Sequence, residues 1–374
     1  MGIPDHIVRR FDRLAEENMR RLLALPDGPV RVIIDSDTAN EIDDQFAIAW
    51  ALLSPDRLQL EGMTAEPFSF QHLRPDLLRA DQHLQAGTPP DESQSFNVGR
   101  SFRQWAAALR RQGRDPGALA FVQPDEGAEL SYAEILRVYE KLGMDPAGQV
   151  FRGSSGYLTS LDQPIRSASS EHIVERALAK TDAPLYVAAM GCLTNVASAL
   201  LMEPAIRHNM VVVWTAGHPS YSYRGNAGSL NLEQDVLASQ LLFESGVALV
   251  YLPGFCIGAQ LRLSLPEMEQ FVRGKGAIGD YLHHLYTHNP IHHQRGVDLL
   301  DWRSWVIWDM IDIAWLLNPD WAPTDIMSAP LLDDSLYWRH QEGRHLMREA
   351  IDIDRDGIFA DLYAKLAAAA GPRG

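Results

Sequence analysis

Three strand–loop–helix units constrain the fold of this chain more than any other feature. They begin at residues 30–34, 185–189 and 210–214, where each run is rich in apolar and β-branched side chains. A helical pattern follows each run after a short loop, and apolar runs of this length are typical of strands buried on both faces. Alternation of such strands with helices predicts an α/β fold with a mostly parallel central sheet and helices on both faces. Ligands of such sheets bind at the carboxyl ends of the strands, so we expect the active site there.

The rest of the sequence favours one domain. Residues 29–370 contain all three units and show no internal repeat or clear linker, so we expect a single α/β domain over this range. Residues 1–28 form an N-terminal helical extension in this prediction. Within it, residues 1–25 predict a charged amphipathic helix with five apolar residues on one side: Ile7, Phe11, Leu14, Met19 and Leu22. Residues 66–156 and 274–305 show weaker patterns, and we expect them to be long excursions over the active-site side of the sheet.

The charge balance limits the partners. The chain has a formal net charge of −16 and a pI near 5.2, whereas nonspecific nucleic-acid binding depends on clustered Lys and Arg. We therefore expect a small ligand that is neutral or cationic, and no nucleic acid. No run of about 20 uncharged apolar residues occurs, and the start lacks the apolar core of a secretory signal, so we expect no membrane span. The two cysteines, Cys192 and Cys256, suit neither a disulfide framework nor a zinc site, which favours a cytoplasmic protein.

A cluster of carboxylates follows the first strand. Five acids lie within ten residues of one strand-to-helix turn: Asp35, Asp37, Glu41, Asp43 and Asp44. Carboxylates at this density repel one another unless a cation lies among them. Oxygen ligands without His or Cys favour Ca²⁺ or Mg²⁺ over zinc. The simpler alternative is a solvated acidic loop that also caps the following helix.

A second motif competes for this segment. An apolar strand that ends in Asp-x-Asp also opens the haloacid dehalogenase phosphatases, where the first Asp is the nucleophile. Those enzymes prefer Thr or Val four residues after that Asp, whereas Ala39 occupies this position here and Thr38 stands one residue early. The trailing Asp43–Asp44 pair has no role in that scheme. A phosphatase therefore stays a minor alternative.

The segment is more similar to the signature of the nucleoside hydrolases. That signature is a strand followed by Asp-x-Asp, a short turn and an Asp-Asp pair at the start of a helix. Asp35 and Asp37 match its first part, and Asp43 and Asp44 match its second. The turn between them is two residues longer than in the family's common form. The inserted turn offers two further candidate ligands, Asn40 and Glu41.

Two downstream segments carry the same resemblance. Residues 190–197 resemble the family's Gly-Pro-Leu-Thr-Asn block, in which the residue before the glycine offers its backbone carbonyl to calcium; that residue here is Met190. The segment that begins at Gly225 resembles the family's glycine–asparagine loop and ribose clamp. In it Asn231 keeps the clamp position, while Ser229 stands where the family usually has Glu. For Asn226, beside glycine, a turn-forming role and a ligand contact are equally open.

A third segment, residues 306–319, resembles the family's His-Asp block. Asp309 keeps the calcium-binding position, and Trp308 replaces the histidine that lies against the leaving base. One purine-selective branch of the family also has tryptophan there and activates the base by stacking. We therefore expect Trp308 to stack on the base and to favour purines, with Phe68 and Phe70 as candidate partners for the opposite face. Core packing is the alternative role for Trp308.

The resemblance implies an N-glycosyl hydrolase that cleaves the bond between base and ribose with a Ca²⁺-activated water. Asp37 is then both metal ligand and general base, and Asp44, Asp309 and the Met190 carbonyl complete the calcium site. The implied substrate-binding residues are Asp43, Asn226, Asn231 and Glu66. Glu66 is included because no asparagine follows the second strand, where the family binds ribose.

Two functional questions stay open at this stage. A histidine could protonate the leaving base, and residues 274–305 contain five candidates: His283, His284, His288, His292 and His293. The non-enzyme alternative is a calcium-stabilised nucleoside- or sugar-binding protein that has lost catalysis. We also expect a homo-oligomer, either a dimer or a tetramer.

Overall fold

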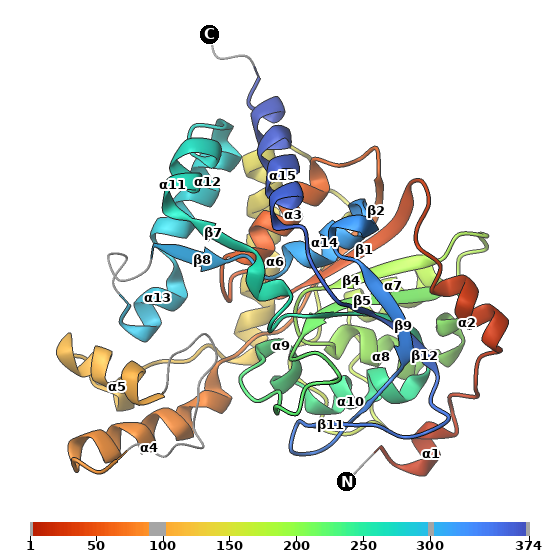
Figure 1. The fold of residues 1–374 in the computed structure, drawn as a ribbon, viewed down its shortest axis with the longest axis horizontal. Coiled ribbons are helices and arrows are strands. Elements are labelled where there is room, and N and C mark those ends of the chain that lie inside the picture. Colours follow the sequence, from red (N-terminus) through yellow and green to blue (C-terminus); the bar gives the residue numbers. More distant parts are fainter. Residues whose placement is uncertain (1–2, 90–101, 298–302, 372–374) are drawn as a thin grey trace.

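The computed structural model describes residues 3–89, 102–297 and 303–371 (Figure 1). Its centre is an eight-stranded sheet in the order β3-β2-β1-β4-β5-β6-β12-β9. The paired strands run parallel except for β12 and β9, which are antiparallel. The strands are β1 (Val30–Ser36), β2 (Leu58–Ala65), β3 (Val150–Phe151), β4 (Leu185–Ala189), β5 (Met210–Ala216), β6 (Ala248–Pro253), β9 (Thr324–Ser328) and β12 (Leu346–Ala350). Two short pairs lie outside the sheet: β7 (Arg262–Ser264) with β8 (Ser304–Val306), and β10 (Leu331–Leu332) with β11 (Trp338–Arg339).

Helices cover both faces of the sheet, as the alternating pattern predicted. One face packs against α3 (Asp43–Leu52), α6 (Pro124–Leu142), α14 (Met310–Leu317) and α15 (Arg355–Ala369). The other face packs against α7 (Ala168–Ala177), α8 (Thr194–Met202) and α10 (Val236–Ser245). The prediction of a single α/β domain with a mostly parallel sheet is confirmed.

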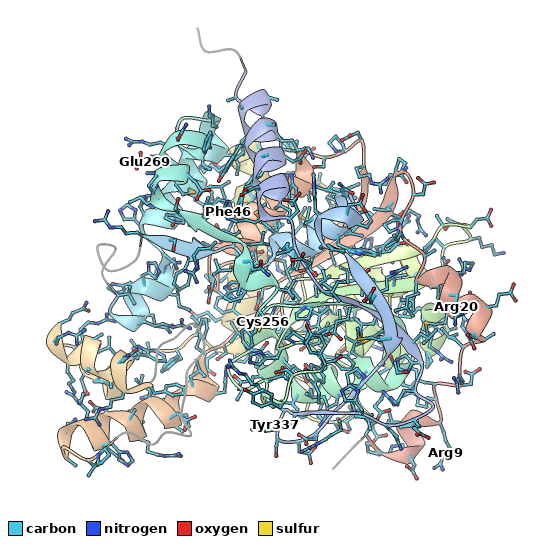
Figure 2. All side chains as sticks on the ribbon, in the orientation of Figure 1. Arg9, Arg20, Phe46, Cys256, Glu269 and Tyr337 are labelled. Atoms are coloured by element: carbon cyan, nitrogen blue, oxygen red, sulfur yellow. The ribbon has the colours of Figure 1, made fainter. Side chains whose placement is uncertain are left out.

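The two faces of the sheet build two separate apolar clusters. Val32 and Ile34 of β1 point into one cluster, and Ile33 points into the other, because successive side chains of a strand alternate between faces. β1, β4, β5 and β6 are buried throughout, which is why their sequences are apolar runs without alternation. Figure 2 shows the result: Phe46 of α3 lies inside the molecule, whereas Arg9, Arg20 and Glu269 lie at its edge.

The N-terminal extension differs from the single helix expected over residues 1–25. It forms two short helices, α1 (Asp5–Val8) and α2 (Glu16–Leu22), and all five of its predicted apolar residues are buried. The expectation of one helix is wrong because these residues serve both faces of the sheet. Ile7 and Phe11 pack into one cluster, whereas Leu14, Met19 and Leu22 pack into the other. One straight helix cannot reach both.

The weakly patterned segments form helices beside the sheet. They contribute α4 (Arg74–Gln85), α5 (Phe102–Arg111), α12 (Gly276–Thr287) and α13 (Pro290–Arg295), in addition to α6 and β3. The short α11 (Leu265–Glu267) lies just before the second segment. The α4–α5 pair projects from the body near α13 (Figure 1), and the Trp105 indole N–H of α5 donates to the Gln294 carbonyl of α13 at 3.1 Å. A short α9 (Leu230–Glu233) precedes α10. Among the helices of the described residues, none is both long enough and apolar enough to cross a membrane.

Candidate active site

The carboxyl end of β1 lies at a switch point of the sheet. From β1 the chain continues to β2 on one side, while β4 lies on the other side. The Met190 N–H donates to the Asp35 carbonyl and the Glu66 N–H donates to the Ser36 carbonyl, both at 2.7 Å. The loops that follow β1, β2 and β4 therefore leave the sheet side by side, which is where parallel sheets bind ligands.

A pocket of about 790 Å³, counting the space open to solvent, lies over these strand ends. Six residues expected to bind metal or substrate line it: Asp37, Asp43, Met190, Asn231, Trp308 and Asp309. Asp44 is fully buried beside them. Both weakly patterned segments reach the pocket, through Phe70, His72, Leu73, Arg295 and Trp305. The prediction that these segments pass over the active-site side is confirmed.

Three carboxylates from two helices meet below the pocket. Oxygen atoms of Asp43, Asp44 and Asp309 all lie within 4.8 Å of one another. Asp43 and Asp44 occupy the first turn of α3, where the helix dipole favours negative charge, and Asp309 immediately precedes α14. Asp43 is a ribose ligand in the prediction from sequence, and its place within this cluster was not predicted.

Asp37 follows β1 and lies beside the cluster, where it interacts electrostatically with Asp44 and Asp309. Gly191 makes this approach possible. A Cβ atom at Gly191 would lie 2.8 Å from the Asp37 carboxyl carbon, too close for any side chain. The glycine after Met190 therefore allows β4 to end directly against the Asp37 carboxylate.

The pKa values of these carboxyl groups indicate that the cluster needs a compensating cation. Burial and then the Asp43 and Glu41 charges raise the pKa of Asp37 to about 8. Burial and neighbouring carboxylates also raise the pKa of Asp43, Asp44 and Asp309 well above the ordinary Asp value. Four acids can ionise together here only if a cation compensates them.

Unsatisfied oxygen atoms support the same interpretation. Asp44 accepts a 2.5 Å hydrogen bond from the Ser36 hydroxyl with one oxygen, while its other oxygen is buried and has no hydrogen-bond partner among the described residues. Asp312, one turn after Asp309, is fully buried, and neither of its carboxylate oxygens has such a partner in that part of the chain. A dense set of oxygen donors with open positions fits a hard divalent cation such as Ca²⁺ or Mg²⁺.

The Gln234 side chain holds the Asp37 carboxylate in place. Its amide N–H donates to Asp37 Oδ2 at 3.2 Å, and its carbonyl oxygen accepts from the Ser69 N–H and the Tyr157 hydroxyl, both at 2.7 Å. A backbone N–H can only donate, so the amide orientation is fixed and the NH₂ group faces Asp37. Gln234 was not predicted, because only the fold brings α9, the loop after β2 and Asp37 together.

The ribose-clamp residue Asn231 contacts two strand ends. Its side-chain N–H donates to the Met190 carbonyl at 2.7 Å and to the Thr215 carbonyl at 3.0 Å. Met190 lines the pocket, and its carbonyl oxygen keeps a second lone pair for a further donor or a cation. Ser229 also lines the pocket, and its hydroxyl oxygen accepts from the Gly217 N–H at 2.8 Å.

Two predicted substrate-binding residues lie outside the pocket lining. Glu66 is fully buried, where its carboxylate accepts from the Asn195 N–H at 3.1 Å and from the Cys192 thiol at 3.2 Å. Asn226 accepts from the His218 N–H at 2.7 Å and donates to the Leu336 carbonyl at 2.9 Å. These contacts give Asn226 the turn-forming role that the sequence had left open.

Aromatic side chains form one wall of the pocket. Trp308 and Phe255 meet edge to face with ring centroids 6.1 Å apart, and both line the pocket. Phe70 lines it as well, whereas Phe68 is buried away from it. Phe255 follows β6 and was not predicted as a pocket residue.

None of the five histidines considered as leaving-group acids is among the pocket-lining residues. His283 pairs with Glu269 at 2.8 Å, and His284 stacks on His288. His292 is buried edge-on against Trp305, and His293 is exposed. The histidine that does line the pocket is His72, in the short 3₁₀ turn Gln71–Leu73 after β2.

Comparisons with known proteins agree with this geometry. The family model described as inosine-uridine preferring nucleoside hydrolase matches residues 123–359. A purine-preferring ribonucleoside hydrolase from Gardnerella vaginalis has the same fold, with a TM-score of 0.59 at 17% identity over 91% of this chain and 99% of its own. An inosine-guanosine nucleoside hydrolase gives 0.59 at 14% identity, over 90% of this chain and 98% of its own. An inosine-uridine preferring nucleoside hydrolase from Bacillus anthracis gives 0.53 at 14% identity, over 90% and 99%.

A sequence comparison with curated proteins finds no match. The phosphatase alternative is set aside on structural grounds. Asp35, which would be its nucleophile, is fully buried and accepts hydrogen bonds from Thr64 at 2.6 Å and Asn195 at 2.9 Å. It is not among the residues that line the pocket.

Proposed function

The chain belongs to the inosine-uridine preferring nucleoside hydrolase family, and we propose that it hydrolyses purine ribonucleosides with the help of Ca²⁺ bound at the end of β1. Members of this family are N-glycosyl hydrolases, and this chain is one by membership and fold. The observation that carries the proposal is the meeting of Asp43, Asp44 and Asp309 within 4.8 Å, beside Asp37 and under the pocket.

The proposed cation ligands are Asp37, Asp43, Asp44, Asp309 and the Met190 carbonyl. All are oxygen donors, and calcium accepts six to eight of these with flexible geometry. The buried Asp44 oxygen without a hydrogen-bond partner supports the assignment, as does the raised pKa of every carboxyl group in the cluster. A bound divalent cation acts as a Lewis acid that acidifies a water molecule.

Asp37 is the proposed general base. It lines the pocket, and Gln234 fixes one of its carboxylate oxygens through a hydrogen bond. In the reaction, the bond between C1′ and the base nitrogen breaks and its electron pair leaves with the base. The water oxygen bonds to C1′, and Asp37 accepts the proton that this water loses. Asn231 and Asp43 are the proposed ligands of the ribose hydroxyls, since both line the pocket beside Met190.

The aromatic wall supports a preference for purines. Trp308 and Phe255 present large π surfaces beside the proposed cation site. A purine overlaps such surfaces more than a pyrimidine, and each aromatic contact contributes about 0.5–1.5 kcal/mol. An aromatic face also attracts the base as it gains positive charge during bond cleavage.

Metal analysis tests the cation site. Purified protein should contain one Ca²⁺ per chain, a chelator should abolish turnover and lower the melting temperature, and added Ca²⁺ should restore both. Asp309→Ala should lose the metal, whereas the surface variant Asp56→Ala should keep it. A transition metal in place of calcium, or full occupancy in Asp309→Ala, would contradict the assignment.

A nucleoside panel tests the substrate. We expect kcat/KM for inosine, adenosine and guanosine to exceed that for uridine and cytidine, and Trp308→Ala to lower the purine values by about twofold to tenfold. Equal purine and pyrimidine rates, or an unaffected variant, would assign Trp308 to packing alone. Binding of metal and nucleosides without turnover would favour a binding protein instead.

A further inference from the structure

Cleavage of the glycosidic bond leaves an electron pair on the departing base, and a proton delivered there lowers the barrier. None of the histidines expected from the sequence lines the pocket, whereas His72 does. We propose that His72 donates this proton and that Glu233 positions its ring. The inference rests on the proposed function and adds the leaving-group acid to it.

His72 and Glu233 face each other across the pocket lining. His72 Nε2 lies 3.4 Å from Glu233 Oε2, with side-chain exposures of 30% and 15%. The other Glu233 oxygen accepts from the Gly228 N–H at 2.7 Å, which fixes the carboxylate. A carboxylate held by the backbone orients a neighbouring imidazole, as the third member does in a catalytic triad.

A second contact fixes the segment that carries His72. The Ser69 N–H donates to the Gln234 side chain, three residues before His72 and one residue after Glu233. The loop after β2 is therefore joined to the end of α9 at two points. The same two residues of this turn, Glu233 and Gln234, thus reach both the proposed acid and the proposed base, since Gln234 also donates to Asp37.

Glu233 Oε2 is buried and has no hydrogen-bond partner among the described residues, so the 3.4 Å approach of His72 Nε2 is an ion-pair distance and not a hydrogen bond. Nε2 thus lies near the Glu233 carboxylate, and the other ring nitrogen, Nδ1, is the proposed proton donor. Trp308 cannot supply the proton, because an indole N–H does not ionise in this range. Glu41 also lines the pocket, but its charge is directed at Arg295 and Trp305.

His72, Asp37, water and solvent account for every proton in the reaction. His72 gives its proton to a ring nitrogen of the purine as the C1′–N bond breaks. The water gives one proton to Asp37 and leaves its oxygen and second hydrogen on C1′ of the ribose. Solvent then reprotonates His72 and takes the proton from Asp37, so that nucleoside and water become ribose and free base.

A substrate with a good leaving group tests the assignment. p-Nitrophenyl β-D-riboside releases a phenolate that needs no proton, whereas inosine needs one. We expect His72→Gln to lower kcat for inosine by about 10²–10⁴-fold while its rate on the nitrophenyl riboside stays near the parental value. Glu233→Gln should lower kcat for inosine less, with KM unchanged. The matched control is His6→Gln, which removes a surface histidine paired with Asp162 at 2.7 Å and should affect neither substrate.

Each other outcome overturns a specific statement. Equal losses on both substrates would show that His72 binds ribose or supports the fold, and an unaffected inosine rate would show that the proton comes from elsewhere. A Glu233→Gln variant whose loss appears in KM alone would make Glu233 a substrate ligand. If the parent enzyme cleaved the nitrophenyl riboside but no nucleoside, or neither compound, the proposed function itself would fail.

Discussion

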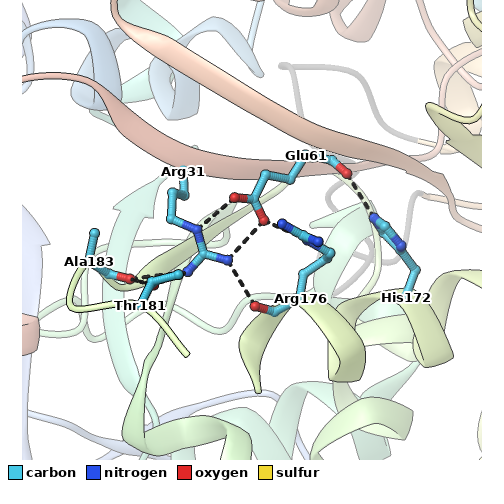
Figure 3. Close-up of polar contacts among 6 residues, drawn as sticks. All are labelled: Arg31, Glu61, His172, Arg176, Thr181 and Ala183. Atoms are coloured by element: carbon cyan, nitrogen blue, oxygen red, sulfur yellow. Dashed lines mark hydrogen bonds and ion pairs between the residues drawn. The ribbon is translucent and has the colours of Figure 1, made fainter. Parts of the chain in front are cut away.

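The two ends of β1 hold buried charge in opposite ways. Near the amino end, Arg31 donates to both oxygens of Glu61 on β2, at 2.6 and 2.9 Å, and Arg176 of α7 donates to Glu61 at 2.8 Å (Figure 3). At the carboxyl end, Asp37, Asp43, Asp44 and Asp309 gather without a lysine or arginine among the causes that shift their pKa values. One strand therefore begins in a complete ion-pair network and ends in an incomplete one.

The amino-end network is complete in detail. Arg31 makes five hydrogen bonds, and those not directed at Glu61 reach Thr181, Ala183 and the Arg176 carbonyl. A guanidinium has five N–H donors, so every one of them is used. The register of β1 and β2 shifts between Val32 and Ile33, which leaves Glu61 as the extra residue of a bulge. A bulge redirects its side chain, here toward Arg31.

The backbone around Glu61 is fixed as well. The His172 ring contacts the Glu61 carbonyl at 2.8 Å, and a Cβ atom at Gly62 would lie 2.6 Å from the same ring nitrogen. The arginines lower the pKa of Glu61, although its burial acts in the opposite direction. An acid whose charge is compensated inside the protein needs no partner from solution, whereas a buried cluster of acids without such partners does. The contrast indicates a structural role for the amino end of β1 and supports the proposed cation-binding role of its carboxyl end.

The largest expected effect is on turnover, from a change in the carboxylate cluster at the carboxyl end of β1. Asp37→Asn keeps the shape of the side chain but removes the proton acceptor, so we expect kcat to fall by about 10²–10⁴-fold. The fold should persist, with an unchanged circular dichroism spectrum, because the change removes a charge that the cluster disfavours. The surface variant Asp56→Asn serves as the control. A near-parental kcat in Asp37→Asn would place the base elsewhere, with Glu41 as the next candidate because it lines the pocket, whereas Asp35 does not.

At the complete end, the effect should appear in stability instead. Glu61→Gln leaves the Arg31 charge buried, with a side-chain exposure of 7%, so we expect the free energy of unfolding to fall by about 3–5 kcal/mol. Urea unfolding in saturating Ca²⁺ measures this, and calcium affinity should not change. The control Glu129→Gln breaks the exposed pair with Arg152 and should cost about 1 kcal/mol or less. Equal losses in the two variants would refute the contrast.

The two ends should also respond to pH with opposite signs. The raised pKa of Asp37, about 8 against 3.8, means that the metal-free native state holds a proton that the unfolded chain releases. Its stability should therefore fall as pH rises between these values, by about 1.4 kcal/mol for each pH unit and proton. The lowered pKa of Glu61 acts oppositely, with stability that is present above its ordinary value and lost in acid. Unfolding curves at about pH 3, pH 5 and pH 8, with chelator and with Ca²⁺, test this. In metal-free protein the Asp37 contribution should fall between about pH 5 and pH 8, and the Glu61 contribution should be lost between about pH 5 and pH 3; the absence of either change would contradict it.

Much of the fold could be predicted because its signals are local. The runs at residues 185–189 and 210–214 are strands in the structure, and the helical pattern expected after the first of these runs is α8. The 19-residue α6 was missed although Pro124 opens it and Gly143, with φ of 67°, ends it. These are ordinary start and stop signals, but its polar residues obscured the helical period. No role was predicted for Arg31, because it lies inside an apolar run. Only the pairing of β1 with β2 places its partner Glu61 beside it.

The residues of the site also divide into those that local sequence predicts and those that only the fold brings together. Asp37, Asp43 and Asp44 are close in sequence, so their proximity in space follows from one strand and one turn. His72 and Phe255 line the pocket from the loop after β2 and the end of β6, and Gln234 reaches Asp37 from the end of α9. No sequence spacing links these three segments, and only the order of strands in the sheet makes them neighbours.

The smallest expected effect is on stability, from a change of Arg176 in the ion-pair network at the amino end of β1. Arg176 is 34% exposed and gives Glu61 a single hydrogen bond, whereas Arg31 holds both carboxylate oxygens. Solvent screens the outer pair, so Arg176→Met should lower the free energy of unfolding by about 1 kcal/mol or less. Turnover and calcium affinity should stay parental. The double variant with Glu61→Gln separates the two arginines: if Arg31 alone compensates Glu61, the Arg176 change should add little to the loss caused by Glu61→Gln. A loss in Arg176→Met as large as that in Glu61→Gln would show that Glu61 needs both arginines, and that even the complete end of β1 is only just balanced.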